Sequence, residues 1–170
     1  MHSVIEDAEH RAREKTMQKI RPCLWFDGQA QEAAEFYVSV FGGDSRVTNV
    51  TYNGEAAPGE IGTVLTVEYV LAGQEYMALN GGPEFTFSEA VSLSVDCATQ
   101  DEVDRLWEAL TEGGAESDCG WLRDKYGFSW QIVPSVLPEL LAGPDKARAE
   151  RVMKAMLGMR KLDAETLRNA

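Results

Sequence analysis

The sequence predicts an α+β fold built from two βαβββ modules, and three observations support this prediction. First, one strand, one amphipathic helix and three short strands occur in the same order twice, at a shift of about 70 residues. Second, each helix stops at a double glycine, at residues 42–43 and 113–114, where a left-handed cap is common. Third, each module has one helix, which can cover only one face of its sheet. The uncovered faces of the two sheets are therefore expected to curve around a shared cleft.

The first module is expected at residues 18–83. Its opening strand is PCLWFD (22–27), and its helix is GQAQEAAEFYVSVF (28–41). The helix has apolar residues at i, i+3, i+4 and i+7, a spacing that predicts one buried stripe made of Ala33, Phe36, Tyr37 and Val40. Three strands are expected after it, at residues 45–52, 62–71 and 75–80.

The second module is expected at residues 84–136 and repeats this pattern. Its strand VSLSVDC (91–97) precedes a helix at 98–110, with a predicted buried stripe of Val103, Leu106, Trp107 and Leu110. Thr99 followed by Glu102 is typical of a capping box. Three more strands are expected at 115–119, 121–126 and 128–133, and Pro134 ends the last one. Asp124 and Lys125 are expected to form a solvated pair in a turn.

Two further segments flank the modules. Residues 1–17 are charged throughout and lack an apolar core, so they indicate an N-terminal extension rather than a signal peptide. Residues 137–170 are expected to form a C-terminal helical segment. Within it, one helix side carries Ala147, Val152, Met153, Met156 and Met159. Such a stripe favours packing at a dimer interface or at the edge of the cleft over an adaptable regulatory surface.

Composition excludes several classes of protein. The 170 residues include 28 acidic and 16 basic side chains, a formal net charge of −12, and no basic patch that would bind nucleic acid. No apolar run approaches the ~20 residues of a membrane span. The three cysteines form no CxxC pair, and an odd number without a secretory signal favours reduced thiols in a cytoplasmic protein.

Strand alternation predicts which residues face the cleft. In the stretch YGFSWQIVPSV (126–136), Trp130 and Ile132 are the natural helix-facing pair, which leaves Gln131 on the cleft face of an apolar strand. The same reasoning places Cys23, Trp25, Tyr76, Asn80, Ser92 and Ser94 on the cleft face. With the aromatic residues Phe85, Phe87 and Trp121, chosen for their ring type, these residues and Gln131 are the ten candidate ligand-binding residues.

These residue types indicate a flat or apolar small-molecule ligand. Aromatic walls stack on such a ligand without needing charge, and Gln131, Ser92 and Ser94 would orient it by hydrogen bonds. Core packing is the competing interpretation for the aromatic residues. An unpaired buried amide costs roughly 1–3 kcal/mol, so Gln131 is expected to have a hydrogen-bond partner in either case.

The chain resembles a known family. Paired βαβββ modules are similar to the vicinal oxygen chelate superfamily, which includes glyoxalase I, extradiol dioxygenases and bleomycin-resistance proteins. The stretches PCLWFDGQAQEAAEFYVSVFG, LNGGPEFTFSEAVSLSVDC and CGWLRDKYGFSWQIVPSVL resemble its PhnB-like branch, which often carries the label 3-demethylubiquinone-9 3-methyltransferase. The resemblance covers residues 19–167 and implies a glyoxalase-like fold and a homodimer.

The resemblance also indicates that no metal is bound. Metal-dependent relatives place one His or Glu on each of four strands, the last in a Gly-x-x-x-Glu context, and here Gln131 stands at that position. An amide oxygen is a weak neutral ligand, whereas a carboxylate supplies charge. The approximate counterparts of the other three ligands are Arg21, Tyr76 and Ala90, none of which suits the role. The two histidines, His2 and His10, both lie in the N-terminal extension.

Two functional classes stay open. The first is a metal-free protein, without a cofactor, that binds a small molecule. The second is an enzyme acting on a small aromatic or quinone-like substrate, including the methyltransferase activity of the family label. The double glycines follow helices, unlike the glycine-rich turn that methyl transfer from S-adenosylmethionine normally uses. Cys23 on the same strand face as Arg21 is a weak candidate nucleophile, with a small buried thiol as the alternative.

Overall fold

The computed structural model describes residues 18–57 and 59–170, and these fold into two compact units, one up to Phe85 and one from Thr86 to Ala170. Each unit is described by itself. The N-terminal extension predicted for residues 1–17 lies outside the described residues. Among the described residues, no helix has the length and apolar composition needed to cross a membrane.

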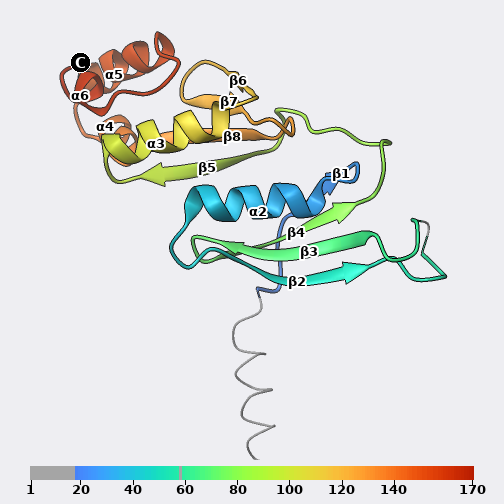
Figure 1. Ribbon diagram of the computed structural model, residues 1–170. Helices are drawn as coiled ribbons and strands as arrows, with labels where there is room; N and C mark the ends of the chain where they lie inside the picture. Colours follow the sequence, from blue (N-terminus) through green and yellow to red (C-terminus); the bar gives the residue numbers. More distant parts are fainter. Residues whose placement is uncertain (1–17, 58) are drawn as a thin grey trace, which may run out of the picture. The chain divides into compact units, whose positions relative to one another are not determined.

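The first unit is a four-stranded sheet with one helix across one face (Figure 1). Its elements are β1 (Cys23–Phe26), α2 (Ala30–Phe41), β2 (Arg46–Tyr52), β3 (Val64–Leu71) and β4 (Gln74–Asn80). The strand order is β1-β4-β3-β2, in which β1 and β4 are parallel and the other pairs are antiparallel. This is the predicted βαβββ module, with each strand end within two residues of its expected position.

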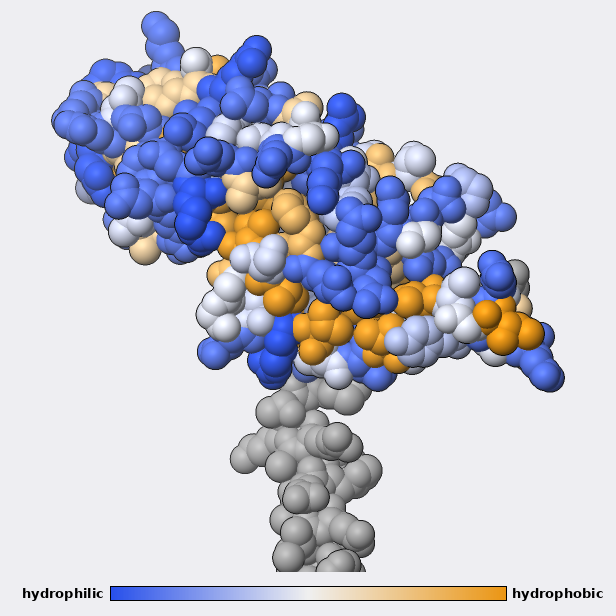
Figure 2. All heavy atoms as spheres, viewed as in Figure 1, coloured by the Kyte–Doolittle hydropathy of each residue, from blue (hydrophilic) through white to orange (hydrophobic). Residues whose placement is uncertain are grey.

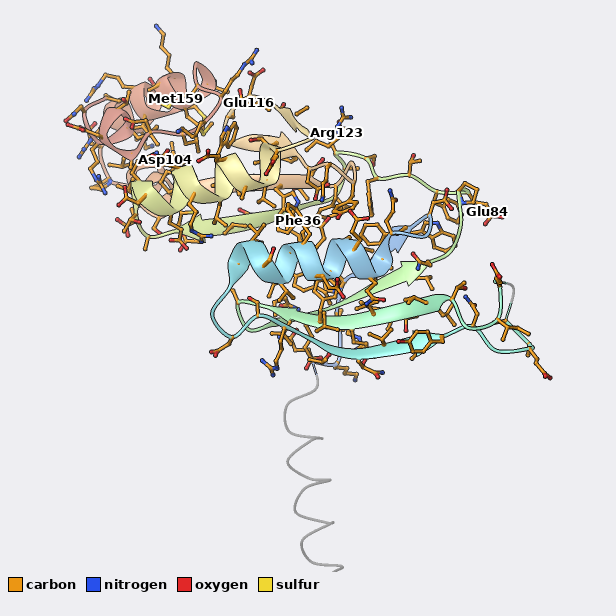
Figure 3. All side chains as sticks on the ribbon, in the orientation of Figure 1. Phe36, Glu84, Asp104, Glu116, Arg123 and Met159 are labelled. Atoms are coloured by element: carbon orange, nitrogen blue, oxygen red, sulfur yellow. The ribbon has the colours of Figure 1, made fainter. Side chains whose placement is uncertain are left out.

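The core of the first unit lies between α2 and the sheet. The helix buries Ala30, Ala33, Ala34, Tyr37 and Val40. The predicted stripe is therefore correct for three of its four members, whereas Phe36 lies at the margin of the stripe and is half-buried (Figure 3). The two small alanines let the helix approach the sheet closely, and the Tyr37 ring lies 6.5 Å from the ring of Tyr69 on β3.

The predicted orientation of β4 is wrong. Tyr76 and Asn80 are expected from the sequence on the face away from the helix, but their strand register places them with Leu24 and Phe26 of β1 on the helix side. The Tyr76 ring stacks on Tyr69 at 5.4 Å, so this side chain is part of the core. The opposite face of β4 instead presents Met77 and Leu79, which are half-buried.

The second unit repeats this topology (Figure 1). Its elements are β5 (Ser92–Cys97), α3 (Gln100–Thr111), β6 (Ala115–Glu116), β7 (Trp121–Arg123) and β8 (Ser129–Pro134). The strand order β5-β8-β7-β6, with β5 parallel to β8, is equivalent to that of the first unit. The α+β class and the pair of βαβββ modules are therefore confirmed.

The core of the second unit agrees with the predicted stripe of α3. All four predicted residues, Val103, Leu106, Trp107 and Leu110, are buried. The Thr99 side chain accepts a hydrogen bond from the Glu102 backbone N–H at 3.2 Å, as predicted for the cap. The Glu102 carboxylate reaches back to the N–H of Ala98 at 2.9 Å, one residue before the expected capping-box position.

Strands β6 and β7 are shorter than predicted because tight turns interrupt them. The backbone turns at Cys119 and Gly120, which have φ of 58° and 83°. A second turn begins at Asp124, which is buried with 2% of its surface exposed. The prediction that Asp124 and Lys125 form a solvated pair is therefore wrong for Asp124, whose carboxylate accepts several hydrogen bonds inside the turn.

Three C-terminal helices complete the second unit: α4 (Val136–Ala142), α5 (Lys146–Leu157) and α6 (Ala164–Arg168). They enclose a cluster of Leu137, Val152, Leu162 and Leu167. Of the predicted stripe, Val152, Met156 and Met159 pack inward, the last from just beyond the end of α5, whereas Ala147 and Met153 are exposed (Figure 3). The surface over α5 and α6 is mostly hydrophilic in Figure 2.

Candidate functional site

One face of the second sheet, the face away from α3, carries most of the polar candidates. Strand register pairs Ser92 with Ser129, Ser94 with Gln131, and Trp121 with Gln131. Because side chains on paired positions point to the same face, Ser92, Ser94, Trp121 and Gln131 share this face. Their shared position agrees with the predicted strand alternation.

Gln131 has the hydrogen-bond partner that its position requires. Its Nε2 donates to the Oγ of Ser92 at 2.9 Å. This bond orients the amide and leaves its Oε1 as the acceptor directed away from Ser92. Gln131 therefore offers a fixed neutral acceptor on a half-buried strand surface.

A cavity of about 520 Å³ lies over this face. Its volume falls within the range of roughly 300–1,000 Å³ typical of small-molecule sites. The sheet supplies Ser94, Asp96, Trp121, Gln131 and Val133, the turn before β7 supplies Cys119, and the helices α4 and α5 supply Leu137, Pro138, Leu141 and Met156. The site thus has a polar sheet side and an apolar helix side.

Asp96 and the helix residues are not among the predicted site residues. Asp96 follows Ser94 by two positions on β5, so strand alternation alone would have found it on the same face. Leu137, Leu141 and Met156 could not be found in this way, because only the packing of α4 and α5 against the sheet brings them there. Met156, a member of the predicted methionine stripe, is one of the residues that line this cavity.

The candidates of the first unit form a separate aromatic contact. The Nε1 of Trp25 donates to the carbonyl oxygen of Gly82 at 2.8 Å, and the Phe85 ring meets the Trp25 ring edge-on at 5.0 Å. Phe85 keeps 65% of its surface exposed, and Cys23 is also exposed. Trp25 and Cys23 share the face away from α2, as predicted.

Three other candidates have structural roles. The Oδ1 of Asn80 accepts from the backbone N–H of Ala30 at 2.9 Å, and its Nδ2 donates to the carbonyl of Val64 at 3.0 Å. Asn80 therefore joins the start of α2 to β3. Tyr76 belongs to the core described above, and the Phe87 ring packs edge-on against Phe128 at 5.1 Å.

A second, larger hollow of about 940 Å³ in the first unit is lined by charged groups of both signs, among them Arg21, Asp44, Arg46, Glu68 and Glu75. Arg21 and Glu68 pair with each other at 2.6 Å. The lining also includes Tyr69, Val70 and the predicted candidate Tyr76. Because most of the lining residues are charged or polar and Arg21 and Glu68 neutralise each other, this hollow is the weaker candidate for a flat or apolar ligand.

Neither Cys23 nor Cys97 has the lowered pKa of an activated nucleophile. Although the side chain of Cys23 is exposed, the surrounding protein partly desolvates its thiol and raises its pKa, and the neighbouring Arg21 only partly opposes that effect. Burial also raises the pKa of Cys97 to about 12, with further contributions from the carboxylates of Glu102 and Asp96. A nucleophilic cysteine needs a lowered pKa, so the hypothesis that Cys23 acts as a nucleophile gains no support.

The donor set does not fit the divalent ion that the fold class often binds. Arg21 is a cation held by Glu68, the Tyr76 ring lies in the core, and Gln131 offers only a neutral amide. Within residues 18–57 and 59–170, no group of three or more His, Cys, Asp or Glu side chains is placed to hold a metal ion. A catalytic zinc site requires three such ligands and an open position.

Two sheets of this order, each covered on one face by one helix, define a protein of the glyoxalase/bleomycin resistance/dioxygenase class. Two solved structures share the fold. The fosfomycin resistance protein FosX from Mesorhizobium loti superposes with a TM-score of 0.54 at 12% identity, over 75% of this chain and 100% of its own. Protein PA1353 from Pseudomonas aeruginosa superposes with a TM-score of 0.58 at 22% identity, over 69% and 98%.

The family follows from two closer similarities. The model of the family described as 3-demethylubiquinone-9 3-methyltransferase matches residues 18–133. A PhnB protein from Bacillus cereus is 38% identical over 69% of this chain and 99% of its own, with a TM-score of 0.63. The chain therefore belongs to this PhnB-like family of the vicinal oxygen chelate superfamily. The sequence matches no protein of curated function.

Proposed function

We propose that this protein binds a small organic molecule, without a metal ion, in the cavity of its second unit. The observation that carries the proposal is the composition of that cavity: a hydrogen-bonding sheet surface with Gln131 and Ser94 faces an apolar wall from Leu137, Leu141 and Met156. Most small-molecule sites combine a largely apolar lining with a few placed polar groups in this way.

Each side of the cavity has a separate part in binding. The apolar wall and the Trp121 ring would take up the flat or apolar body of the ligand, because burying such surface releases roughly 25 cal/mol per Å². Gln131, held by Ser92, would orient the polar end of the ligand through its Oε1. No step of this proposal uses a metal ion or a cofactor.

A second candidate function comes from the family description, which names a methyltransferase. The glycine-rich stretch NGGP follows β4, but no helix opens after it, and the next element is β5. A Cβ at Gly81 would lie 2.2 Å from the Trp25 ring, so that glycine is explained by close packing. A calorimetric titration with S-adenosylmethionine tests this candidate, and saturable binding would favour it.

The family resemblance also supports a homodimer. Native mass spectrometry of the freshly purified full chain would report the subunit number, any divalent ion and any co-purified organic mass together. A stoichiometric metal would contradict the metal-free proposal. The cytoplasmic location expected from the three cysteines stays a prediction.

The direct test of binding uses two matched methionines of α5. Met156 lines the cavity, whereas Met153, one turn earlier, is 40% exposed and does not. We expect Met156→Trp to fill the cavity and remove binding of 2-naphthol, a flat neutral probe, and Met153→Trp to leave it unchanged. Isothermal titration calorimetry measures both.

Met156 also packs against the C-terminal core, so the fold of the variant is checked by thermal unfolding. Leu141→Trp is the second cavity-filling variant, from a different helix. Equal binding of 2-naphthol by the wild type and by both folded cavity-filling variants would show that the cavity is not the binding site.

A further inference from the structure

We propose that the cavity of the second unit selects ligands whose apolar body ends in a cationic or strongly hydrogen-bond-donating group, with Asp96 as the group that recognises this end. The inference rests on the proposed function and specifies the class of ligand. Three observations lead to it: the acceptor character of the polar side, the sign of the lining charge, and the free face of one tryptophan.

The polar side of the cavity presents two acceptor groups from the sheet, the Gln131 carbonyl and the Asp96 carboxylate. One N–H of the Gln131 Nε2 is used by Ser92, so Gln131 offers its carbonyl oxygen Oε1 and the second N–H. The Asp96 carboxylate is also an acceptor, two positions after Ser94 on the same strand face, which is about 7 Å along the strand. Gln131 pairs with Ser94 across the strands, so its Oε1 and the Asp96 carboxylate lie on one face and favour a ligand that brings its own N–H or O–H groups.

The charge of the lining has one sign. Asp96 supplies the only carboxylate among the described residues that line the cavity, and no Lys, Arg or His side chain stands among them. Within the described part of the chain, Asp96 makes no side-chain hydrogen bond and no ion pair. An anionic ligand would therefore meet an uncompensated negative charge beside an apolar wall, whereas a cationic ligand would gain a charge-assisted hydrogen bond.

Trp121 completes the site. With the described residues, the Trp121 ring makes no aromatic contact and its indole N–H makes no hydrogen bond. The Trp121 side chain is half-buried and lines the cavity. Two other tryptophans have ring contacts that occupy them, Trp25 with Phe85 and Trp130 with Phe128. An available indole face attracts a flat ring and also an ammonium group, through the quadrupole of its π system.

The test uses three probes that share one naphthalene body and differ only in the charge of the end group: 2-naphthylmethylamine, which is protonated at neutral pH, 2-naphthalenemethanol and 2-naphthoate. Calorimetry with the full chain is expected to rank them amine, alcohol, acid. Because Asp96 is solvent-exposed, we expect a preference of about tenfold for the amine over the alcohol, and this preference should shrink as salt is added.

Two variants locate the recognition. Asp96→Asn, which keeps the shape and removes the charge, should weaken binding of the amine much more than binding of the alcohol and so abolish the preference for the amine. Asp27→Asn removes one exposed charge from the first unit and should keep the full preference. Thermal unfolding confirms that both variants fold.

The possible results separate the two proposals. Equal binding of the three probes, or a preference that survives Asp96→Asn, would overturn the charge selection and leave the small-molecule site standing. Tighter binding of the naphthoate would also overturn it. Failure of all three probes to bind would contradict both proposals.

Discussion

The Oδ2 atom of Asp124 accepts a hydrogen bond from the Nε1 of Trp130 at 2.8 Å, and both residues are almost fully buried. The Oδ1 atom of the same carboxylate accepts from the backbone N–H groups of Tyr126 at 2.9 Å and Phe128 at 3.0 Å. One side chain therefore holds the turn between β7 and β8 and fixes a core tryptophan, on the strand that also carries Gln131.

Replacement of Asp124 by alanine is the first prediction. It would leave two backbone donors and one indole donor without this acceptor in a buried turn. Each unsatisfied buried group costs roughly 1–3 kcal/mol, so we expect Asp124→Ala to lower the free energy of unfolding by about 3 kcal/mol or more. Urea denaturation measures this change. Asp118→Ala, at an exposed aspartate of the preceding turn, is the control, and an equally small effect of both variants would contradict the role of Asp124.

The alternation of β4 illustrates what the sequence could not decide. Strand alternation correctly groups Tyr76 with Asn80, but it does not say which group meets the helix. In β8 the large apolar pair Trp130 and Ile132 resolves the choice. In β4 both faces are largely apolar, with Met77 on the side opposite Tyr76, so only the packing of α2 on the sheet decides the orientation.

The candidate site, like β4, could be predicted from the sequence only in part. Ser94 and Gln131 could be found because strand alternation is a local property of the chain, and Trp121 could be found from its aromatic side chain. The apolar wall could not, because Leu137 and Met156 reach the cavity through contacts between distant segments of the second unit. The burial of Asp124 is missed for a different reason. Its partners are local, within six residues, but a charged pair in a turn looks solvated in the sequence until the buried indole donor of Trp130 is placed beside it.

Gly114 is the subject of the second prediction. A Cβ at this position would lie 2.1 Å from the carbonyl oxygen of Arg123 and 2.9 Å from the Cα of Asp124. These are backbone atoms at the start of the turn that Asp124 holds, so they cannot move aside easily. We expect Gly114→Ala to destabilise the protein by about 1–3 kcal/mol, the range typical of overpacking.

The matched control for Gly114 is Gly54→Ala. A Cβ at Gly54 meets no atom within 4 Å, and its φ lies outside the left-handed region. We expect the control to change the free energy of unfolding by less than about 0.5 kcal/mol. Thermal unfolding of both variants compares their stabilities. Similar stabilities would show that the turn adapts to the methyl group added at position 114.

Cys97 makes the stability of the protein depend on alkaline pH. Its pKa is raised from 9.0 to about 12 in the folded state, chiefly by burial. Between these two values the unfolded chain releases the thiol proton while the folded chain keeps it. The contribution of Cys97 is therefore complete below about pH 9 and decreases as the pH rises, by at most about 1.4 kcal/mol per pH unit.

Comparison with Cys97→Ala isolates this effect, because all other groups titrate equally in both proteins. We expect the difference in the free energy of unfolding, wild type minus variant, to shrink between about pH 9 and about pH 10.5. Urea denaturation in the presence of a reducing agent measures it. A difference that stays constant over this range would show that the thiol titrates alike in the folded and unfolded states.

The last prediction concerns the metal. If the loss of one carboxylate at position 131 were the sole reason for a metal-free site, Gln131→Glu would restore ion binding. We expect otherwise, because two other positions that correspond to metal ligands in metal-dependent relatives are also unsuitable. Arg21 is a cation paired with Glu68, and Tyr76 is packed on Tyr69. A divalent ion held by a single carboxylate lacks the three ligands that a catalytic zinc site requires.

We therefore expect native mass spectrometry to show no stoichiometric Zn²⁺ or Mn²⁺ on either the wild type or Gln131→Glu. The variant should instead be less stable, because its carboxylate cannot donate the hydrogen bond that Nε2 now gives to Ser92, and the Ser92 hydroxyl must turn to donate in its place. One bound ion per chain in the variant alone would mean that the remaining ligands exist elsewhere in the chain. One bound ion in the wild type would instead contradict the metal-free proposal itself.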